Sequence, residues 1–307
     1  MIMKTRSMPV ELEILRSLSG RKKLDEKLEN QLSSLEKGFK GELLFDQWLE
    51  NINSDCVILN DLLLEQKNTQ FQIDSLLVTQ SQIYLFEVKN FEGDYYLDGD
   101  RWCTSSGIEI KSPQLQLTRS EALFRQLLHS IGFNNPIQTY LIFVNPEFYL
   151  YQTPLGIPII FPTQINRFII NLYSKSSKLS ASHHKLAQKL VSLHKQESPY
   201  MRIPNYSFEE LKKGILCGYG CGEFMVNQTQ NLLVCKKCGS QEKNESAIIR
   251  TVEEFKLLFP DQNVTTKNIF EWSNEIITKK TLQRILSKHY KTNERARASH
   301  YVKSEKQ

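Results

Sequence analysis

The sequence lacks a long apolar run, and no apolar core follows its first basic residues. The most apolar stretch, residues 140–161, is interrupted by prolines and polar residues, whereas a membrane-spanning helix needs about 20 apolar residues. Lys4 and Arg6 precede mixed polar sequence, unlike the start of a signal peptide. We therefore expect a cytoplasmic protein without a membrane partner. In that reducing compartment, cysteines favour metal binding over disulfides.

The chain also lacks a strong excess of either charge. Its 307 residues include 39 Lys and Arg against 34 Asp and Glu, and the net charge of +5 is common among cytosolic enzymes. With 40% hydrophobic residues, wholesale disorder is excluded. The positive charge gathers near the C-terminus, because residues 279–306 hold nine Lys or Arg and two acids. We expect a polyanion to bind there.

Hydrophobic spacing predicts an α/β domain followed by smaller units. Three- and four-residue spacings predict helices over residues 30–52 and 115–128. Short apolar runs predict strands at residues 56–59, 71–79, 83–90, 95–97 and 139–144. The predicted parts are an N-terminal helical extension (1–30), an α/β domain (31–163), a helical connector (164–210), a small cysteine-containing unit (211–245), a three-helix unit (246–292) and a basic tail (293–307).

Residues 71–90 predict an antiparallel hairpin with charged residues at one end. If Gln80 and Ser81 form the loop, the numbers of two residues that face each other across the hairpin add up to 161. Asp74 then lies opposite Glu87, and Gln72 opposite Lys89. Strand alternation then puts Asp74, Glu87 and Lys89 on one face. Both faces are otherwise apolar, which indicates a sheet covered on both sides.

This arrangement favours metal-dependent phosphodiester chemistry. Two carboxylates at the end of a covered sheet are costly to bury without compensation. Directly opposed residues have Cβ atoms about 5 Å apart, so Asp74 and Glu87 can bind one Mg²⁺ or Mn²⁺ ion. The Lys89 ammonium can orient a water for attack on a phosphodiester. The alternative is a solvated Glu87–Lys89 ion pair, with Asp74 capping a loop.

Further motifs accompany the pair in a fixed order. They are Gly41-Glu42, the strand-end turn Asn60-Asp61-Leu62, Gln72-Ile73-Asp74, Glu87-Val88-Lys89-Asn90, Gly93, Trp102 and the Pro-x-x-Gln from Pro113 to Gln116. With these motifs, residues 37–125 resemble the nuclease-related domain family, NERD, a branch of the restriction-endonuclease-like PD-(D/E)xK proteins. The resemblance implies a mixed sheet flanked by helices. It also implies metal binding by Asp74 and Glu87, a water-orienting or charge-stabilising Lys89, and supporting roles for Glu42 and Gln116.

The two supporting residues, Glu42 and Gln116, can also be explained without a role in the site. Glu42 is also compatible with a solvated helix residue, and Gln116 with a polar residue at a helix terminus. Gly38 and Gly41 would let the Glu42 helix approach the sheet closely. Many family members carry His after the Ile-Asp pair, where this chain has Ser75. Alternation points Ser75 away from the carboxylates, so metal binding is not put in doubt.

Four cysteines predict a structural zinc site. Cys217-x3-Cys221 and Cys235-x2-Cys238 are separated by thirteen residues, the spacing typical of a zinc ribbon. Four thiolates leave no open position for water, so this Zn²⁺ would stabilise a unit too small for its own core. Disulfides or unrelated thiols are the alternative. Cys56 and Cys103 stand apart, and the six histidines form no matching pattern.

The residues after the cysteines resemble a helix-turn-helix domain. Helices are predicted around residues 248–258, after a cap at Thr265 or Thr266, and after a cap at Thr278. The last helix presents the basic and polar residues Lys279, Lys280, Gln283, Arg284 and Lys288 for nucleic-acid contact. DNA is favoured over RNA because a helix fits the B-form major groove. A helical subdomain that is merely packed, or that docks on a protein, is the alternative.

Together these features predict a metal-dependent nuclease that hydrolyses phosphodiester bonds, chiefly in DNA, and is positioned by the zinc and helical units. One alternative is a DNA-binding regulator whose nuclease-like domain serves as a binding or dimerisation platform without turnover. Another is an RNA-processing protein. A homodimer is compatible with each of these functions.

Overall fold

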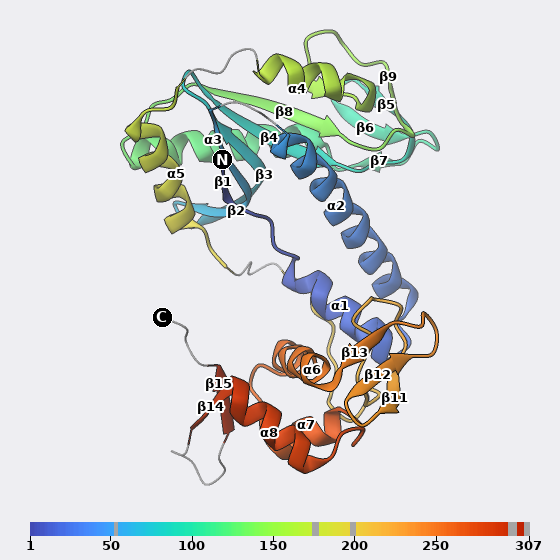
Figure 1. Ribbon diagram of the computed structural model, residues 1–307. Coiled ribbons are helices and arrows are strands. Elements are labelled where there is room, and N and C mark those ends of the chain that lie inside the picture. Colours follow the sequence, from blue (N-terminus) through green and yellow to red (C-terminus); the bar gives the residue numbers. More distant parts are fainter. Residues whose placement is uncertain (52–54, 174–177, 197–200, 294–299, 304–307) are drawn as a thin grey trace. The chain divides into compact units, whose positions relative to one another are not determined.

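The computed structural model describes residues 1–51, 55–173, 178–196, 201–293 and 300–303. The chain forms two compact units (Figure 1). The first, here the α/β unit, comprises Met1–Pro9 and Ser33–Met201, and the second, the ribbon-helix unit, comprises Val10–Leu32 and Arg202–Gln307. The chain therefore passes between the units three times. This differs from the sequence-based boundaries, which treat residues 1–30 as one extension.

A six-stranded mixed sheet is the centre of the α/β unit. Its order is β1-β2-β3-β4-β8-β10. The strands are β1 (Ile2–Lys4), β2 (Val57–Gln66), β3 (Thr69–Val78), β4 (Ile83–Lys89), β8 (Ile137–Phe143) and β10 (Ile159–Ile160). Strands β2, β3 and β4 are antiparallel, whereas β1 with β2, β4 with β8 and β8 with β10 are parallel.

Helices cover both faces of this sheet, which confirms the predicted fold class. One core contains Leu76 and Leu85 with residues of α3 (Pro113–Ser130) and α5 (Ala181–Leu193). The other contains Leu77 and Phe86 with residues of α2 (Glu26–Glu50) and α4 (Ile165–Tyr173). Alternate residues of β3 and β4 enter opposite cores because successive side chains of a strand point to opposite faces.

A second, four-stranded sheet lies at the side of the α/β unit. Its order is β7-β6-β5-β9, with β5 (Gly93–Asp98), β6 (Arg101–Thr104), β7 (Glu109–Ile110) and β9 (Phe148–Tyr151). Trp102 on β6 is buried and stacks on Phe143 of β8, with ring centroids 5.9 Å apart. The two sheets therefore share one hydrophobic core.

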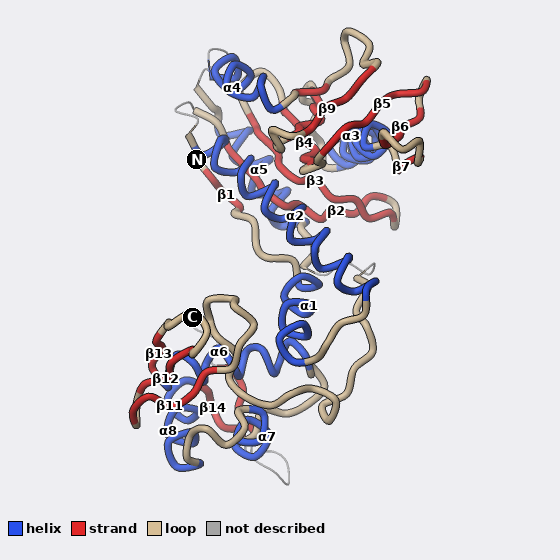
Figure 2. Tube along the Cα trace, turned by 90° about the vertical axis from the view of Figure 1, so that its right-hand side faces the viewer, coloured by secondary structure: helices blue, strands red, loops and turns tan. Residues whose placement is uncertain are grey.

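The ribbon-helix unit combines a small antiparallel sheet with helices. The sheet consists of β11 (Met225–Thr229), β12 (Leu232–Cys235) and β13 (Gln241–Lys243), and the helices are α1 (Val10–Arg21), α6 (Asn244–Leu258), α7 (Thr266–Trp272) and α8 (Lys279–His289). Strands β12 and β13 contact α6 (Figure 2). Helix α1 also packs on α6, so an N-terminal segment completes this unit.

The segment predicted as a basic tail contributes one strand of a hairpin, whose other strand begins at the end of the predicted three-helix unit. Strand β14 (Tyr290–Asn293) pairs with β15 (His300–Lys303), and Tyr301 of β15 bridges to Val264. The remaining tail positions, 294–299 and 304–307, lie outside the described residues. Across the described part of the chain, no helix combines the length and apolar character needed to cross a bilayer.

Candidate active site and cysteine cluster

The β3–β4 hairpin has the predicted register. Its ladder runs from Val78–Ile83 to Ser75–Phe86, and each of these pairs sums to 161. Beyond Ser75 the ladder ends, and the Val88 N–H instead donates to Asp74 Oδ2 at 2.8 Å. The expected pairing of Gln72 with Lys89 is absent from this ladder, and Gln72 Nε2 donates to Asp61 Oδ1 at 2.9 Å. The end of the hairpin is thus held by a carboxylate.

Glu87, Lys89 and Gln116 form a hydrogen-bonded group beside Asp74. Lys89 Nζ donates to Glu87 Oε1 at 2.6 Å and to Gln116 Oε1 at 3.2 Å. Gln116 Nε2 donates to the same Glu87 oxygen at 2.5 Å. Gln116 reaches the site because Ser112 caps α3 and Pro113 begins it, which sets the first helical turn over this end of the sheet. Gln116 is therefore more than a helix-terminus residue.

Burial strongly changes the acidity of these groups. The Glu87 side chain is 1% exposed, and burial together with the Asp74 charge raises its pKa to about 8. Burial also raises the pKa of Asp74, although Lys89 and the Val88 N–H oppose this shift. Burial alone would lower the pKa of Lys89, but Glu87 and Asp74 outweigh it and raise that pKa. Lys89 therefore stays a cation, and the carboxylates favour either protons or a nearby cation.

The carboxylate pair fits a hard divalent cation. Glu87 Oε2 is buried and makes no hydrogen bond to any described residue. An unsatisfied buried carboxylate oxygen is costly, and a bound cation would compensate it. Oxygen donors are the ligands that Mg²⁺ and Mn²⁺ prefer. Among the described residues, no group of three acidic or histidine side chains converges at this end of the sheet.

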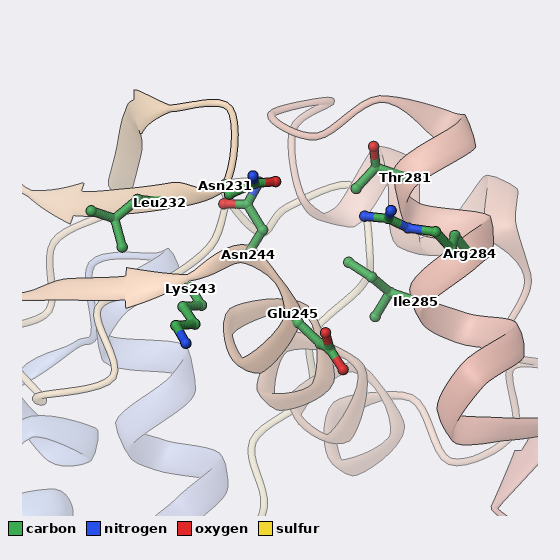
Figure 3. Close-up of a pocket in the computed structure, with 8 residues that line it drawn as sticks. All are labelled: Asn231, Leu232, Lys243, Asn244, Glu245, Thr281, Arg284 and Ile285. Carbon is green, nitrogen blue, oxygen red and sulfur yellow. The ribbon is translucent and has the colours of Figure 1, made fainter.

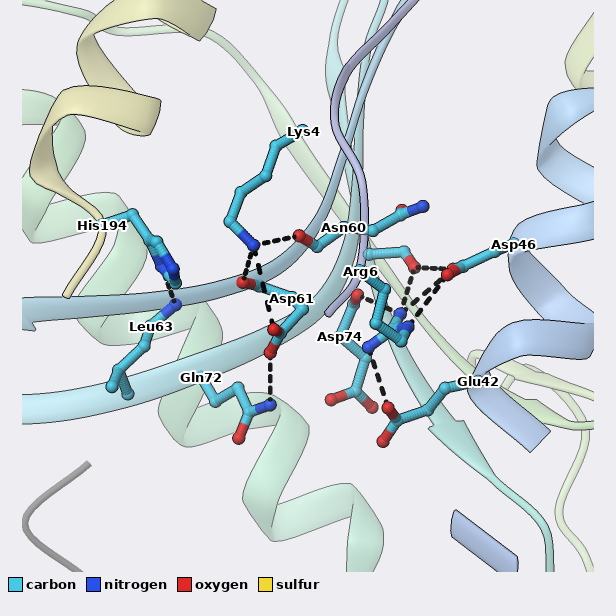
Figure 4. Close-up of polar contacts among 11 residues, drawn as sticks. Lys4, Arg6, Glu42, Asp46, Asn60, Asp61, Leu63, Gln72, Asp74 and His194 are labelled. Atoms are coloured by element: carbon cyan, nitrogen blue, oxygen red, sulfur yellow. Dashed lines mark hydrogen bonds and ion pairs between the residues drawn. The ribbon is translucent and has the colours of Figure 1, made fainter. Parts of the chain in front are cut away.

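Glu42 lies at the same end of the sheet but is bound to an arginine that sequence reasoning missed. Arg6 Nη1 donates to Glu42 Oε2 at 2.8 Å (Figure 4). Burial, then the Asp74 charge, raises the pKa of Glu42 to about 8 while Arg6 opposes the shift. Ser75 faces away from the carboxylate pair as expected, and its Oγ donates to Asp46 Oδ1 at 3.3 Å. Glu42 is therefore a partly buried, ion-paired residue of the site region rather than a fully solvated one.

A neighbouring motif differs from its prediction. Asn60-Asp61-Leu62 lies within β2 rather than at a strand end. Asp61 has φ 55°, a left-handed conformation that is uncommon for a non-glycine residue. Lys4 Nζ donates to the carbonyls of Asn60 and Asp61 at 2.8 and 2.6 Å, which stabilises this interruption of the strand (Figure 4). The Asp61 charge contributes to the raised pKa values of Asp74 and Glu42.

The pKa values predict how stability depends on pH when Mg²⁺ and Mn²⁺ are absent. Glu87 and Glu42 ordinarily titrate near 4.5, but in the folded protein their pKa is about 8. Between these values the folded state binds more protons than the unfolded state, so the free energy of unfolding falls as pH rises from 4.5 to 8. Calorimetric unfolding across this range should show the decline for the α/β unit.

Glu87→Gln is the matched variant for this pH experiment. It removes one titrating group while retaining the side-chain length, so the variant should lose stability less steeply and exceed the parent at pH 8. Since one pKa unit corresponds to about 1.4 kcal/mol, the gain should be a few kcal/mol at most. Identical pH slopes for the variant and the parent would contradict the proposed burial of an ionisable Glu87.

Gly41 allows α2 to contact the sheet closely, and we predict a large local effect of Gly41→Ala. An added Cβ would lie 2.6 Å from Asn90 Cβ and 3.1 Å from Val144 Cγ2. This overpacking should lower the free energy of unfolding by about 1–3 kcal/mol. Gly38→Ala is the control, because its added Cβ has nothing within 4 Å. Gly38 therefore does not serve the close approach expected of it, and its replacement should stabilise α2 by about 1 kcal/mol.

The four predicted cysteines converge in the ribbon-helix unit. Their Sγ atoms all lie within 4.8 Å of one another, with 3.6 Å between Cys217 and Cys238 and 3.3 Å between Cys221 and Cys235. A tetrahedral Zn–S distance of about 2.3 Å requires sulfurs about 3.8 Å apart, so the cluster is compatible with zinc. The Ser240 hydroxyl and backbone N–H lower the pKa of Cys238 to about 6, which favours the metal-binding thiolate.

Helix α8 has the predicted amphipathic arrangement. Thr278 caps it through the Thr281 N–H, and Thr265 caps α7. Leu282, Ile285 and Leu286 are buried. The predicted contact residues Lys279, Lys280, Gln283, Arg284 and Lys288 are exposed. Lys288 forms an ion pair with Glu245 at 2.7 Å, so its charge is partly neutralised.

A pocket of about 280 Å³ lies between α8, the start of α6 and the ribbon. It is lined by Asn231, Leu232, Lys243, Asn244, Glu245, Thr281, Arg284 and Ile285. Figure 3 shows Arg284 and Ile285 projecting from α8 toward the side of the pocket formed by Asn244 and Glu245. The basic helix and the ribbon therefore border one continuous surface.

A family model matches part of the α/β unit. Residues 37–144 match the family model described as the nuclease-related domain. This range contains Glu42, Asp74, Glu87, Lys89 and Gln116, whereas Arg6 and all four clustered cysteines lie outside it. No curated protein matches the chain.

Proposed function

Because the chain contains a nuclease-related domain at residues 37–144, we propose that it is a metal-dependent nuclease that hydrolyses phosphodiester bonds in DNA. The observation that carries this proposal is the buried group at the end of the six-stranded sheet. There, Glu87 binds Lys89 and Gln116 through one oxygen, while its other oxygen is buried without a partner among the described residues. Such an incomplete acidic site suits a cation-dependent reaction on an anionic substrate.

Asp74 and Glu87 would hold Mg²⁺ or Mn²⁺ in this reaction. When bound, the ion would lower the pKa of water and neutralise charge that develops on the phosphate. Lys89 keeps its proton, so its ammonium can orient the attacking water or stabilise the phosphate oxygens. Gln116 holds Lys89 and Glu87 in one group, and Glu42, bound by Arg6, helps to organise the pocket from α2. Hydrolysis adds the water oxygen to phosphorus and breaks one P–O ester bond.

The ribbon-helix unit would bind the substrate. Four cysteinates would close the coordination shell of one structural Zn²⁺, leaving no position for catalysis. The exposed residues Lys279, Lys280, Gln283 and Arg284 form a basic helix face suited to phosphate contacts and base edges in a major groove. DNA is preferred over RNA because the A-form major groove is too narrow for a helix. A homodimer would give two such sites in one assembly.

Cleavage of a mixed substrate panel tests the proposal. Purified zinc-loaded protein is incubated with Mg²⁺ or Mn²⁺ and with labelled duplex DNA, single-stranded DNA and single-stranded RNA. We expect metal-dependent products from DNA and loss of these products in Lys89→Ala. Salt-sensitive DNA binding without any product would support the non-catalytic regulator instead, and preferential cutting of RNA would support RNA processing.

A further inference from the structure

Arg6 is almost fully buried in the α/β unit, outside the matched domain. It follows β1, which pairs with β2, and its side chain is 1% exposed. Its guanidinium donates two hydrogen bonds to the Asp46 carboxylate, from Nε to Oδ2 at 2.9 Å and from Nη2 to Oδ1 at 3.0 Å. This bidentate contact sets the plane of the guanidinium, because the donors of arginine form a rigid fork.

Arg6 also donates hydrogen bonds to groups at the acidic site, from Nη1 and again from Nη2. Nη1 donates to the Glu42 carboxylate on α2 at 2.8 Å. Nη2 donates to the backbone carbonyl of Asp74 at 2.6 Å and to Ser75 Oγ at 3.2 Å. One buried side chain thus joins the N-terminal segment, α2 and β3 at the acidic site (Figure 4).

We propose that Arg6 is a positioning residue of the acidic site: its guanidinium fixes the Glu42 carboxylate and the backbone that carries Asp74. This inference rests on the proposed nuclease function. Among the described residues, no hydrogen bond joins Arg6 to the Asp74 carboxylate or to Glu87, so Arg6 acts through Glu42 and the Asp74 backbone. The N-terminal segment is consequently part of the site, although the matched domain begins only at residue 37.

Arg6→Lys separates positioning from charge. Lysine retains the positive charge, but a single ammonium cannot reproduce the planar fork that reaches Asp46, Glu42 and the Asp74 carbonyl together. Partners that orient metal ligands commonly change affinity or activity by about 10–100-fold when they are mutated. We expect kcat to fall by about that factor with KM for DNA unchanged, and Mn²⁺ affinity, measured by paramagnetic resonance, to fall about tenfold.

Chemical rescue provides a readout that a merely structural role would not show. Arg6→Ala leaves space beside Asp46 and Glu42, and added guanidinium ion should restore part of the lost kcat. If Arg6→Lys does not fold, as judged by circular dichroism, Asp46→Asn loosens the anchor of Arg6 and should reproduce the loss of kcat at unchanged KM.

Two further variants, Arg21→Lys and Asp74→Asn, show whether a negative result contradicts the role of Arg6 or the nuclease function itself. Arg21→Lys is a matched control, because Arg21 is also fully buried and pairs with Glu254 at 2.6 Å in the ribbon-helix unit, and it should leave Mn²⁺ affinity unchanged. If Arg6→Lys keeps the kcat and Mn²⁺ affinity of the parent while Asp74→Asn loses both, the proposed role of Arg6 is overturned and the proposed nuclease function stands. Parent-like values in Asp74→Asn would instead overturn the proposed function.

Discussion

Asp74→Asn is expected to lower the DNA cleavage rate by about a thousandfold, equivalent to about 4 kcal/mol of transition-state stabilisation. The amide keeps the shape of the carboxylate and retains an oxygen that can accept from the Val88 N–H. It removes the negative charge that would help to hold a divalent cation. The rate is measured on labelled DNA at saturating Mg²⁺ or Mn²⁺.

Folding and specificity controls make this result interpretable. Burial raises the pKa of Asp74, so its ionised form is unfavourable in the folded protein, and Asp74→Asn should unfold no earlier than the parent without added metal. Glu65→Gln is the matched acidic control, because Glu65 lies on β2 of the same sheet and pairs with Lys195 at 3.6 Å. It should cut at the parent rate. A folded Asp74→Asn protein that also cuts at that rate would contradict the metal-binding assignment.

Loss of zinc is expected to have the largest effect on stability. Structural zinc sites contribute about 10 kcal/mol or more to the folding of small units, which matches or exceeds the typical stability of a whole domain. Cys235→Ser should therefore reduce zinc from one ion per chain to about none and unfold the ribbon around β11, β12 and β13. Elemental analysis measures the zinc, and limited proteolysis detects the opened ribbon.

Nucleic-acid binding should change together with the ribbon. Strands β12 and β13 pack on α6, and α6 in turn contacts α8, so unfolding the ribbon removes support from the basic helix. DNA affinity of Cys235→Ser should fall by at least about tenfold at fixed salt concentration. Cys103→Ala is the control, since Cys103 is a buried cysteine of the other unit and should leave the zinc content at the parent value. Full zinc content in Cys235→Ser would exclude the four-cysteine site.

Local sequence was sufficient to predict the hairpin and the helix caps. Alternation over residues 71–90 has a period of two, which assigns Leu76 and Leu77 to opposite cores and determines the register through the turn. A cap at Thr265 or Thr266 and another at Thr278 were recognisable because a hydroxyl before a helical apolar pattern satisfies the first free N–H groups, and the structure places the first of them at Thr265. In each case the interacting groups are close in sequence.

Long-range partners were not predictable in the same way. Strand β1 is three residues long and carries too little periodicity to identify, and its partner β2 begins more than fifty positions later. Arg6 finds Glu42, Asp46 and Asp74 only after β1 is placed beside β2. Similarly, α1 joins α6 in a unit whose other residues begin at position 202. Residues 1–30 therefore looked like one extension but belong to two units.

Three features could be read from the sequence: the strand alternation, the spacing of the four clustered cysteines as two close pairs along the chain, and the order of motifs around Asp74, Glu87 and Lys89. These features depend on neighbours within one turn, one hairpin or one metal knuckle. Three features became visible only in the folded chain: Gln116 binds Glu87, Glu87 Oε2 has no partner among the described residues, and Arg6 enters the site. Packing brings those groups together from separate helices and strands, and burial then changes their acidity.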